Sequence, residues 1–143
     1  MGTSTNAILF YGICWDEEDH IWPWAVRYGT LPKEMRARLD SEGDAESDEA
    51  WLERNLPGSG LEIGEHCMAS CKMGYVAVSS TSALAWRGGL KKLDLVASAH
   101  QEYTQEQVWR QKLADFCAVA GYDFDHLDRM GRVGWFLCAW WSE

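Results

Sequence analysis

The sequence contains no hydrophobic run that approaches the roughly 18–20 residues of a membrane-spanning helix. Its first residues, Met1 to Asn6, have neither the basic start nor the apolar stretch of a secretory signal, so we expect no export. The nucleotide-binding patterns GxGxxG and GxxxxGKS/T are absent, as are the HExxH and GxSxG patterns of hydrolases. No catalytic residue can be named from a motif, and this favours a protein that is not an enzyme.

Basic residues are also in short supply. Thirteen Lys and Arg stand against 22 Asp and Glu, which gives a formal net charge of -9. Nucleic acids and anionic membranes are bound by neutralising their charge, so neither is expected as a partner. Electrostatic attraction would instead steer this chain toward a basic surface.

The composition fits one soluble globular domain. The 143 residues are 47% hydrophobic and 24% charged, and a chain of this length buries enough surface for a core without disulfides. We predict a single domain over residues 1–143, with an irregular acidic segment at about residues 40–49. Among the nine tryptophans, Trp109 and Trp135 are expected to be buried in the core.

Period-two alternation of apolar residues predicts four to five strands. Asn6–Trp15 and Val133–Trp141 are apolar on both faces, which is typical of central strands that are covered on both sides. We expect these two strands to be neighbours in the centre of the sheet. Three shorter strands are also predicted. Leu61–Cys67 alternates like an edge strand, Gly74–Ser80 is the second, and Ala83–Trp86 extends the same ladder as the third.

The strongest helix pattern covers Gln105–Ala120. Thr104 and Gln107 fit a capping box at its start, and Gly121 supplies a left-handed stop. Residues Leu90–Tyr103, which precede it, are expected to form a loop with at most one turn of helix. The apolar stripe of the helix consists of Trp109, Leu113, Phe116, Cys117 and Ala120.

Shorter helices are predicted over Pro32–Leu39, over Asp48–Leu56 with Ser47 as its N-cap, and directly after Asp123. In the last of these, Phe124, Leu127 and Met130 are expected to point inward. The order of strands and helices predicts an α+β fold. We expect a mixed or antiparallel sheet of four to five strands with the Gln105–Ala120 helix packed on one face.

Acidic runs are the most distinctive feature of the expected surface. Asp16–Asp19 brings four charges in four residues, and Asp40–Glu49 brings six in ten. Trp22 and Trp24 follow the first run and hold two large rings on a stiff segment, as interface anchors do. Acidic loops also serve solubility alone, and the two indoles equally suit a lid on a core. The candidate partner-binding residues are Asp16, Glu17, Glu18, Asp19, Trp22, Trp24, Asp44, Glu46, Asp48 and Glu49.

The five cysteines are odd in number and lack a secretory context, so we interpret them as reduced thiols. His66, Cys67 and Cys71 lie close together in the sequence, with Cys14 and His20 elsewhere, and this grouping raises the question of tetrahedral zinc. A second ligand pair of matching spacing is missing. We therefore expect no metal and no other cofactor.

Three blocks of the chain carry a resemblance: NAILFYGICWDEE, then LEIGEHC with MGYVAV, and the closing GWFLCAWWS. With the pair Arg87-Gly88 they resemble small proteins of tailed bacteriophages and prophages, which open with an N-A-I-L-F-Y-G-x-C-W-like strand and end in a G-W-aromatic segment. The resemblance covers about half of the chain, and the acidic segment Ser41–Glu49 matches none of its blocks. It implies a virus–host setting and nothing about catalysis.

Together these features predict a non-enzymatic binding protein in the cytoplasm of a bacterial host. It would cover a basic surface of a host protein, such as a defence or nucleic-acid-handling factor, with acids steering the encounter and indoles slowing dissociation. One alternative is a small-molecule or nucleotide-binding module, or a small hydrolase, whose aromatic pocket gathers His66, Cys67, Tyr75 and Arg87. Another is a structural role in the virion.

Overall fold

The computed structural model describes residues 4–15, 22, 24, 34, 47–66, 73–86 and 89–142. Contacts within the chain divide it into two compact units. The first comprises Met1–His20 and Gly60–Glu143, and the second, Ile21–Ser59, is inserted into it in sequence. The first unit carries the α+β fold that the sequence predicts. Among the helices of the described residues, none has the length and apolar character needed to cross a membrane.

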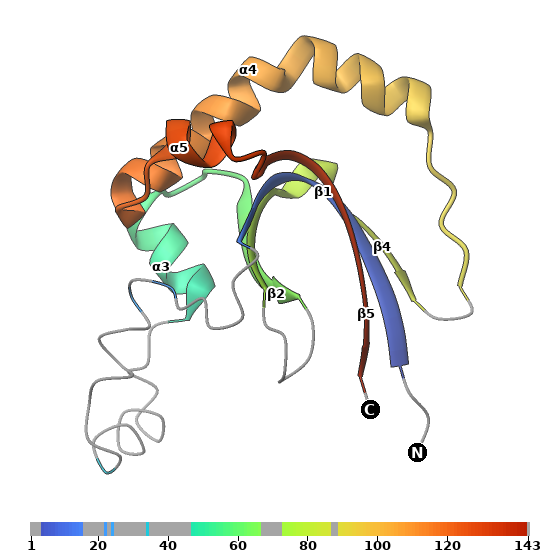
Figure 1. Ribbon diagram of the computed structural model, residues 1–143, viewed down its shortest axis with the longest axis horizontal. Coiled ribbons are helices and arrows are strands. Elements are labelled where there is room, and N and C mark those ends of the chain that lie inside the picture. The colour runs from blue at the N-terminus through green and yellow to red at the C-terminus, as the bar shows by residue number, and fades with distance from the viewer. Residues whose placement is uncertain are drawn as a thin grey trace. The chain divides into compact units, whose positions relative to one another are not determined.

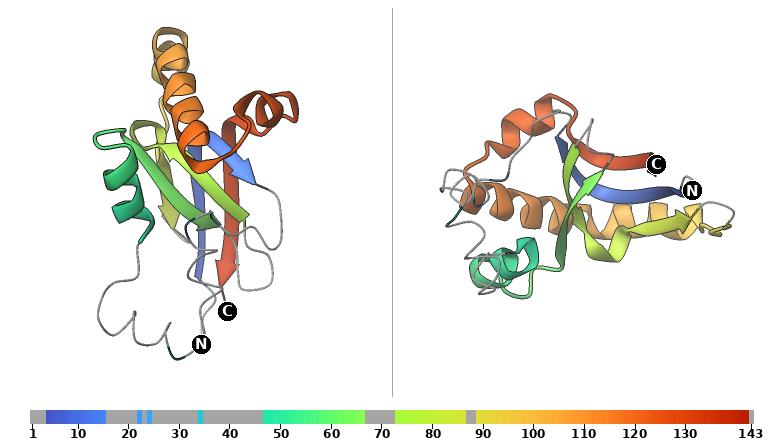
Figure 2. Two further views of the ribbon diagram at one scale, coloured as in Figure 1. Left: turned by 90° about the vertical axis from the view of Figure 1, so that its left-hand side faces the viewer. Right: turned by 90° about the horizontal axis from the view of Figure 1, so that it is seen from below.

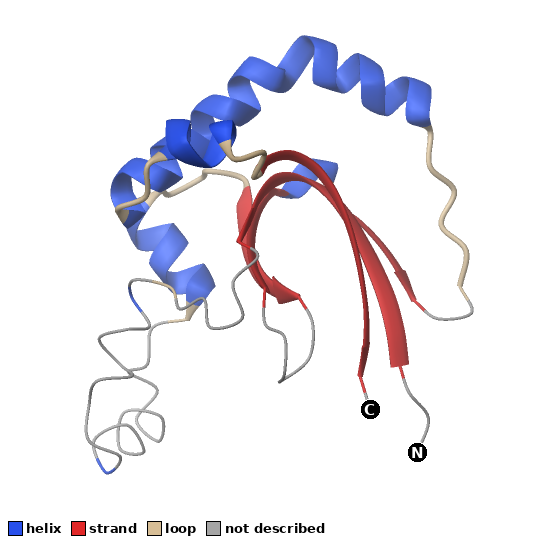
Figure 3. Ribbon diagram, viewed as in Figure 1, coloured by secondary structure: helices blue, strands red, loops and turns tan. Residues whose placement is uncertain are grey.

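The first unit is built on an antiparallel sheet of five strands (Figures 1 and 3). The strands are β1 (Ser4–Trp15), β2 (Leu61–His66), β3 (Met73–Val78), β4 (Ala83–Trp86) and β5 (Val133–Ser142). Along one edge of β1 runs β5, with Ser4 opposite Ser142 and Ile13 opposite Val133. The other edge of β1 is shared by β3 and β4, and β2 pairs with β3.

The first and last strands are neighbours, as expected, but only β1 is central. Among the described strands, β5 pairs with β1 alone. The apolar pattern on both faces of β5 has another cause, because each face packs on an aromatic ring of β1. Trp135 lies against Tyr11 with ring centroids 5.6 Å apart, and Phe136 lies against Phe10 at 5.8 Å.

A 3-10 turn, Ser79–Thr81, separates β3 from β4 opposite the middle of β1. The turn interrupts the ladder beside Tyr11, whose backbone N–H would otherwise lack a strand partner. Thr81 supplies one: its buried Oγ1 accepts from the N–H of Tyr11 at 2.9 Å and donates to the carbonyl of Val78 at 2.7 Å. One hydroxyl thus satisfies the buried backbone at the junction.

Helix α4 (Leu95–Ala120) covers one face of the sheet, above β1 and β5 (Figures 1 and 2). It starts at Leu95 rather than at the predicted Gln105, because Asp94 caps it by accepting from the N–H of Ala97 at 3.0 Å. Thr104, the predicted cap, lies inside the helix and donates to a carbonyl one turn earlier. Gly121 ends the helix at φ 88°, as predicted. The whole predicted stripe is buried: Trp109, Leu113, Phe116, Cys117 and Ala120.

Aromatic rings fill both faces of the sheet. Toward α4, Tyr11 packs on Trp109 with centroids 5.1 Å apart, and Trp15 packs on Phe116 and Tyr122. On the opposite face, the fully buried Phe10 stacks on Tyr75 at 4.7 Å. Because successive residues of a strand alternate between faces, the odd positions of β1 serve α4 and the even positions serve the other core.

Two short helices complete the described fold. In the first unit, α5 (Phe124–Arg129) begins at the predicted cap Asp123, which accepts from the N–H of His126 at 3.2 Å. Leu127 is buried as expected, but Met130 follows the last helical residue and is 57% exposed, so its predicted inward position is wrong. In the second unit, α3 (Asp48–Asn55) has the predicted N-cap Ser47.

Candidate functional site

The second unit brings together an indole and an acid from the candidate partner-binding set. The indole N–H of Trp24 donates to Oδ1 of Asp48 at 2.9 Å. The ring of Trp24 also stacks on Trp51, with centroids 4.1 Å apart, and on Trp22 at 5.3 Å with an interplanar angle of 3°. We call these four residues, together with the neighbouring acid Glu49, the acid–indole patch.

The sequence around Ser47 explains why this helix starts where it does. Ser47 Oγ accepts from the N–H of Ala50 at 3.1 Å and so satisfies one of the first amides of α3. Asp48 and Glu49 then occupy the first turn, where the positive end of the helix dipole favours carboxylates. The helix fixes the backbone of Asp48 while Trp24 holds its carboxylate. Both the backbone and the carboxylate of Asp48 are therefore held in place.

Burial differs among the three rings. Trp22 is only 3% exposed and Trp51 is buried as well, whereas Trp24 is half-buried. The burial of Trp22 favours a role as a ring that closes a core, rather than a role as an interface anchor. Trp51 was not among the candidates. Its position three residues after Asp48, on the same side of a helix, is the signal that could have placed it in the patch.

Several candidate acids lie outside the described residues. They are Asp16, Glu17, Glu18, Asp19, Asp44 and Glu46, so their role in binding stays a prediction. Of the predicted helix Pro32–Leu39, Glu34 is described and is helical. Cys67, Cys71, Arg87 and the side chain of His66 are also outside the described set. Within the described set, no three His, Cys, Asp or Glu side chains are arranged to hold a metal ion.

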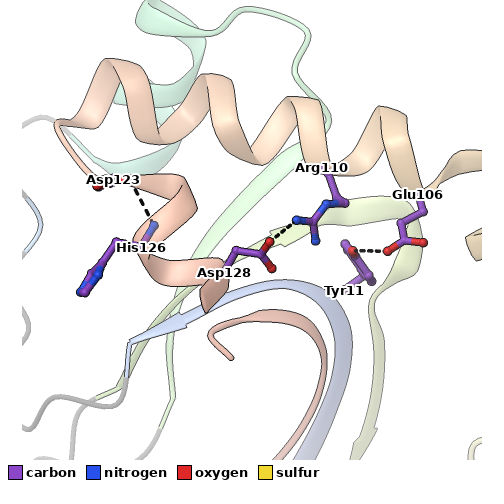
Figure 4. A network of polar contacts seen from close by, with 6 residues as sticks. All are labelled: Tyr11, Glu106, Arg110, Asp123, His126 and Asp128. Atoms are coloured by element: carbon purple, nitrogen blue, oxygen red, sulfur yellow. Dashed lines mark hydrogen bonds and ion pairs between the residues drawn. The ribbon is translucent and has the colours of Figure 1, made fainter. Parts of the chain in front are cut away.

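A polar network joins β1, α4 and α5 in the first unit (Figure 4). The phenol of Tyr11 donates to Oε1 of Glu106 at 3.3 Å, and Arg110 pairs with Asp128. Burial raises the pKa of the Tyr11 phenol, and the hydrogen bond to Asp128 raises the pKa of Arg110. Neither group is tuned to exchange protons near neutral pH. The network ties α5 to α4 and is structural in character.

The described cysteines differ in reactivity. Cys14 shares a hydrogen bond with Cys138, and this bond lowers the pKa of the Cys138 thiol. Burial, by contrast, raises the pKa of Cys117 to about 12. Cys138 is half-buried whereas Cys14 and Cys117 are buried. Because the thiolate is the nucleophile, these pKa shifts favour reaction at Cys138 over reaction at Cys117.

A pocket of about 240 Å³ lies between the N-terminal half of α4 and the sheet. Its walls are lined by Leu9, Leu95, Ser98, Ala99, Glu102 and Trp135. Trp135, which the sequence placed in the core, is only half-buried and lines this pocket. Tyr75 lies on the opposite face of the sheet, packed on Phe10. The pocket is therefore not the one predicted around His66 and Tyr75.

Comparisons of the chain with known protein families, with characterised proteins and with solved structures gave no match. The resemblance to phage proteins therefore stays a prediction. Function has to be inferred from the geometry of the acid–indole patch and of the pocket beside α4.

Proposed function

We propose that the protein is a non-enzymatic binding protein that covers a basic surface of another protein. The observation that carries this proposal is the hydrogen bond between Trp24 and Asp48. It joins one ring and one acid from the two groups of residues that are expected to contact a partner. The formal net charge of -9 also supports a positively charged partner, because it attracts basic surfaces over a distance.

The chemistry of the acid–indole patch suits lysine and arginine side chains. The carboxylates of Asp48 and Glu49 offer charge complementarity, and the half-buried ring of Trp24 offers flat apolar area beside them. Since the ring is already stacked on Trp51, little side-chain entropy remains to be lost on binding. Acids then increase the association rate, and the ordered indole slows dissociation.

The resemblance to phage proteins supports a specific setting for this activity. In that setting the partner is a protein of the bacterial host, such as a defence or nucleic-acid-handling factor, and binding takes place in the host cytoplasm. The mechanism is occlusion: the bound protein blocks access to the basic surface. No bond is made or broken.

The proposal is tested by reversing one charge in the patch and an equivalent charge elsewhere. The immobilised protein is used to capture partners from a bacterial lysate at low and at high salt, and the partner is then purified for association kinetics. Glu49→Lys changes an exposed acid in the first turn of α3, and Asp125→Lys changes an exposed acid in the first turn of α5. Both substitutions make the same charge change at equivalent helix positions.

We expect a basic partner that is retained at low salt and lost at high salt, where the Debye length falls below about 10 Å. Glu49→Lys should slow association about three- to tenfold, because it removes steering charge at the interface, and Asp125→Lys should have a smaller effect. Equal effects of the two substitutions, or a partner whose binding ignores salt, would contradict the proposal.

A further inference from the structure

The pocket beside α4 has an ordered wall on each side. Leu95, Ser98, Ala99 and Glu102 follow the spacing i, i+3, i+4, i+7, so they form one face of the helix. Leu9 of β1 and the ring of Trp135 of β5 form the opposite wall. All of these residues belong to the first unit, so the pocket does not depend on the placement of the insertion.

The lining is apolar except at two points. Ser98 contributes a hydroxyl, and Glu102 contributes the one charged group. Among the described residues no cation forms an ion pair with Glu102, whereas Glu106, one turn further along α4, accepts from Tyr11. The pocket therefore combines an apolar body with a carboxylate that is available to a ligand.

We propose that this pocket is a binding site for a small organic cation, namely a protonated amine on an apolar body. Leu9, Leu95 and Trp135 would bury the apolar body, and Glu102 would accept a charge-assisted hydrogen bond from the ammonium group. The face of the Trp135 ring offers a further favourable surface for a cation. An anionic ligand would meet Glu102 and be repelled.

The volume sets the size of the ligand. About 240 Å³ lies below the roughly 300–1,000 Å³ of pockets that hold drug-sized molecules. An amine with a short alkyl chain or a single ring fits this space, and a nucleotide does not. This site is independent of the acid–indole patch, so either proposal can fail without the other.

The test is a titration of the full protein with three probes of matched shape. Hexylamine is cationic at neutral pH, hexanol is neutral and hexanoate is anionic. Binding is followed by NMR through the indole N–H signal of Trp135. We expect hexylamine to bind, hexanol to bind about fivefold more weakly, and hexanoate to bind more weakly still, as expected for one partly exposed ion pair.

Two variants locate the site. Glu102→Gln should abolish the preference for hexylamine over hexanol. Ala99→Leu should fill the pocket and lower the binding affinity of both probes more than tenfold. Leucine is a good helix former, so the second change should leave α4 intact. The matched controls are Asp125→Asn and Ala118→Leu, which alter an exposed acid and an exposed alanine outside the pocket.

Four results would overturn the proposal. The first is equal binding of hexylamine and hexanol to the unmodified protein, and the second is a preference for the amine that survives Glu102→Gln. The third is the absence of any probe binding at millimolar concentrations. Unchanged affinity in Ala99→Leu would likewise place the bound probe elsewhere on the molecule.

Discussion

Replacing Thr81 with valine would remove one hydroxyl from the turn between β3 and β4 while nearly preserving the shape of the side chain. The site is buried, so water cannot take over the role of the hydroxyl. Two backbone groups lose their partner: the N–H of Tyr11, which donates to Thr81 Oγ1, and the carbonyl of Val78, which accepts from it. The substitution therefore tests how far β1 depends on this single side chain.

The expected loss follows from these two contacts. A buried polar group that loses its partner costs about 1–3 kcal/mol. The N–H of Tyr11 has one proton and loses its acceptor completely, whereas the carbonyl of Val78 keeps a second lone pair. We therefore expect Thr81→Val to lower the free energy of unfolding by about 2–4 kcal/mol, a large share of the 5–15 kcal/mol that is typical of a folded protein.

Urea denaturation followed by tryptophan fluorescence measures this loss. The midpoint should fall by about 1–2 M with little change in slope, given an m-value of about 2 kcal/mol per M. Thr81→Ser is the control, because serine keeps the hydroxyl and loses one methyl group, at a cost of about 1 kcal/mol. The reasoning fails if the free energy of unfolding of Thr81→Val lies within about 0.5 kcal/mol of that of the unmodified protein. It also fails if Thr81→Ser lowers the free energy of unfolding as much as Thr81→Val does.

Three further predictions follow from charge and titration. Replacing Asp16–Asp19 with lysines should slow association with the partner and flatten its salt dependence in a surface-binding assay, and unchanged kinetics would exclude this run from the interface. Cys138 should react with iodoacetamide faster than Cys117, as scored by peptide mass spectrometry, and Cys14→Ala should slow it; equal rates at Cys138 and Cys117 would refute the thiol assignment. Burial raises the pKa of the Tyr75 phenol, so the unfolded state releases this proton first as the pH rises past about 10. The free energy of unfolding should therefore decrease above about pH 10, and a decrease of the same size in Tyr75→Phe would show that this residue is not the cause.

Local signals in the sequence predicted much of the fold. The caps Ser47 and Asp123 and the stop Gly121 act through their own backbone neighbours, so they can be read without tertiary information. The buried stripe of α4 was also predictable, because its residues recur at helical spacing. The start of α4 was not: Leu95 and Val96 are exposed, so this half of the helix carries no buried stripe. The cap Asp94 was the only local signal there.

Contacts between distant segments could not be predicted in this way. The hydrogen bond between Trp24 and Asp48 joins a ring that follows the first acidic run to an acid within the second, and no periodicity relates the two residues. The contact between Cys14 and Cys138 also depends on tertiary structure. In the register of the sheet Cys138 lies opposite Ile8, six positions away from Cys14. Bending of β1 and β5, which Figure 1 shows, is needed to bring the two thiols together.

The pairing of β1 with β5 has a consequence for synthesis on the ribosome. At about 5–20 residues per second, β1 leaves the ribosome many seconds before its longest partner has been made. Closing so large a loop is entropically slow, and the sheet stays incomplete until Val133–Ser142 has emerged. Until then an apolar strand with an open edge is exposed to the cell, where chaperones bind such segments. A message truncated before Val133 should therefore yield a product that is degraded rather than a smaller folded protein.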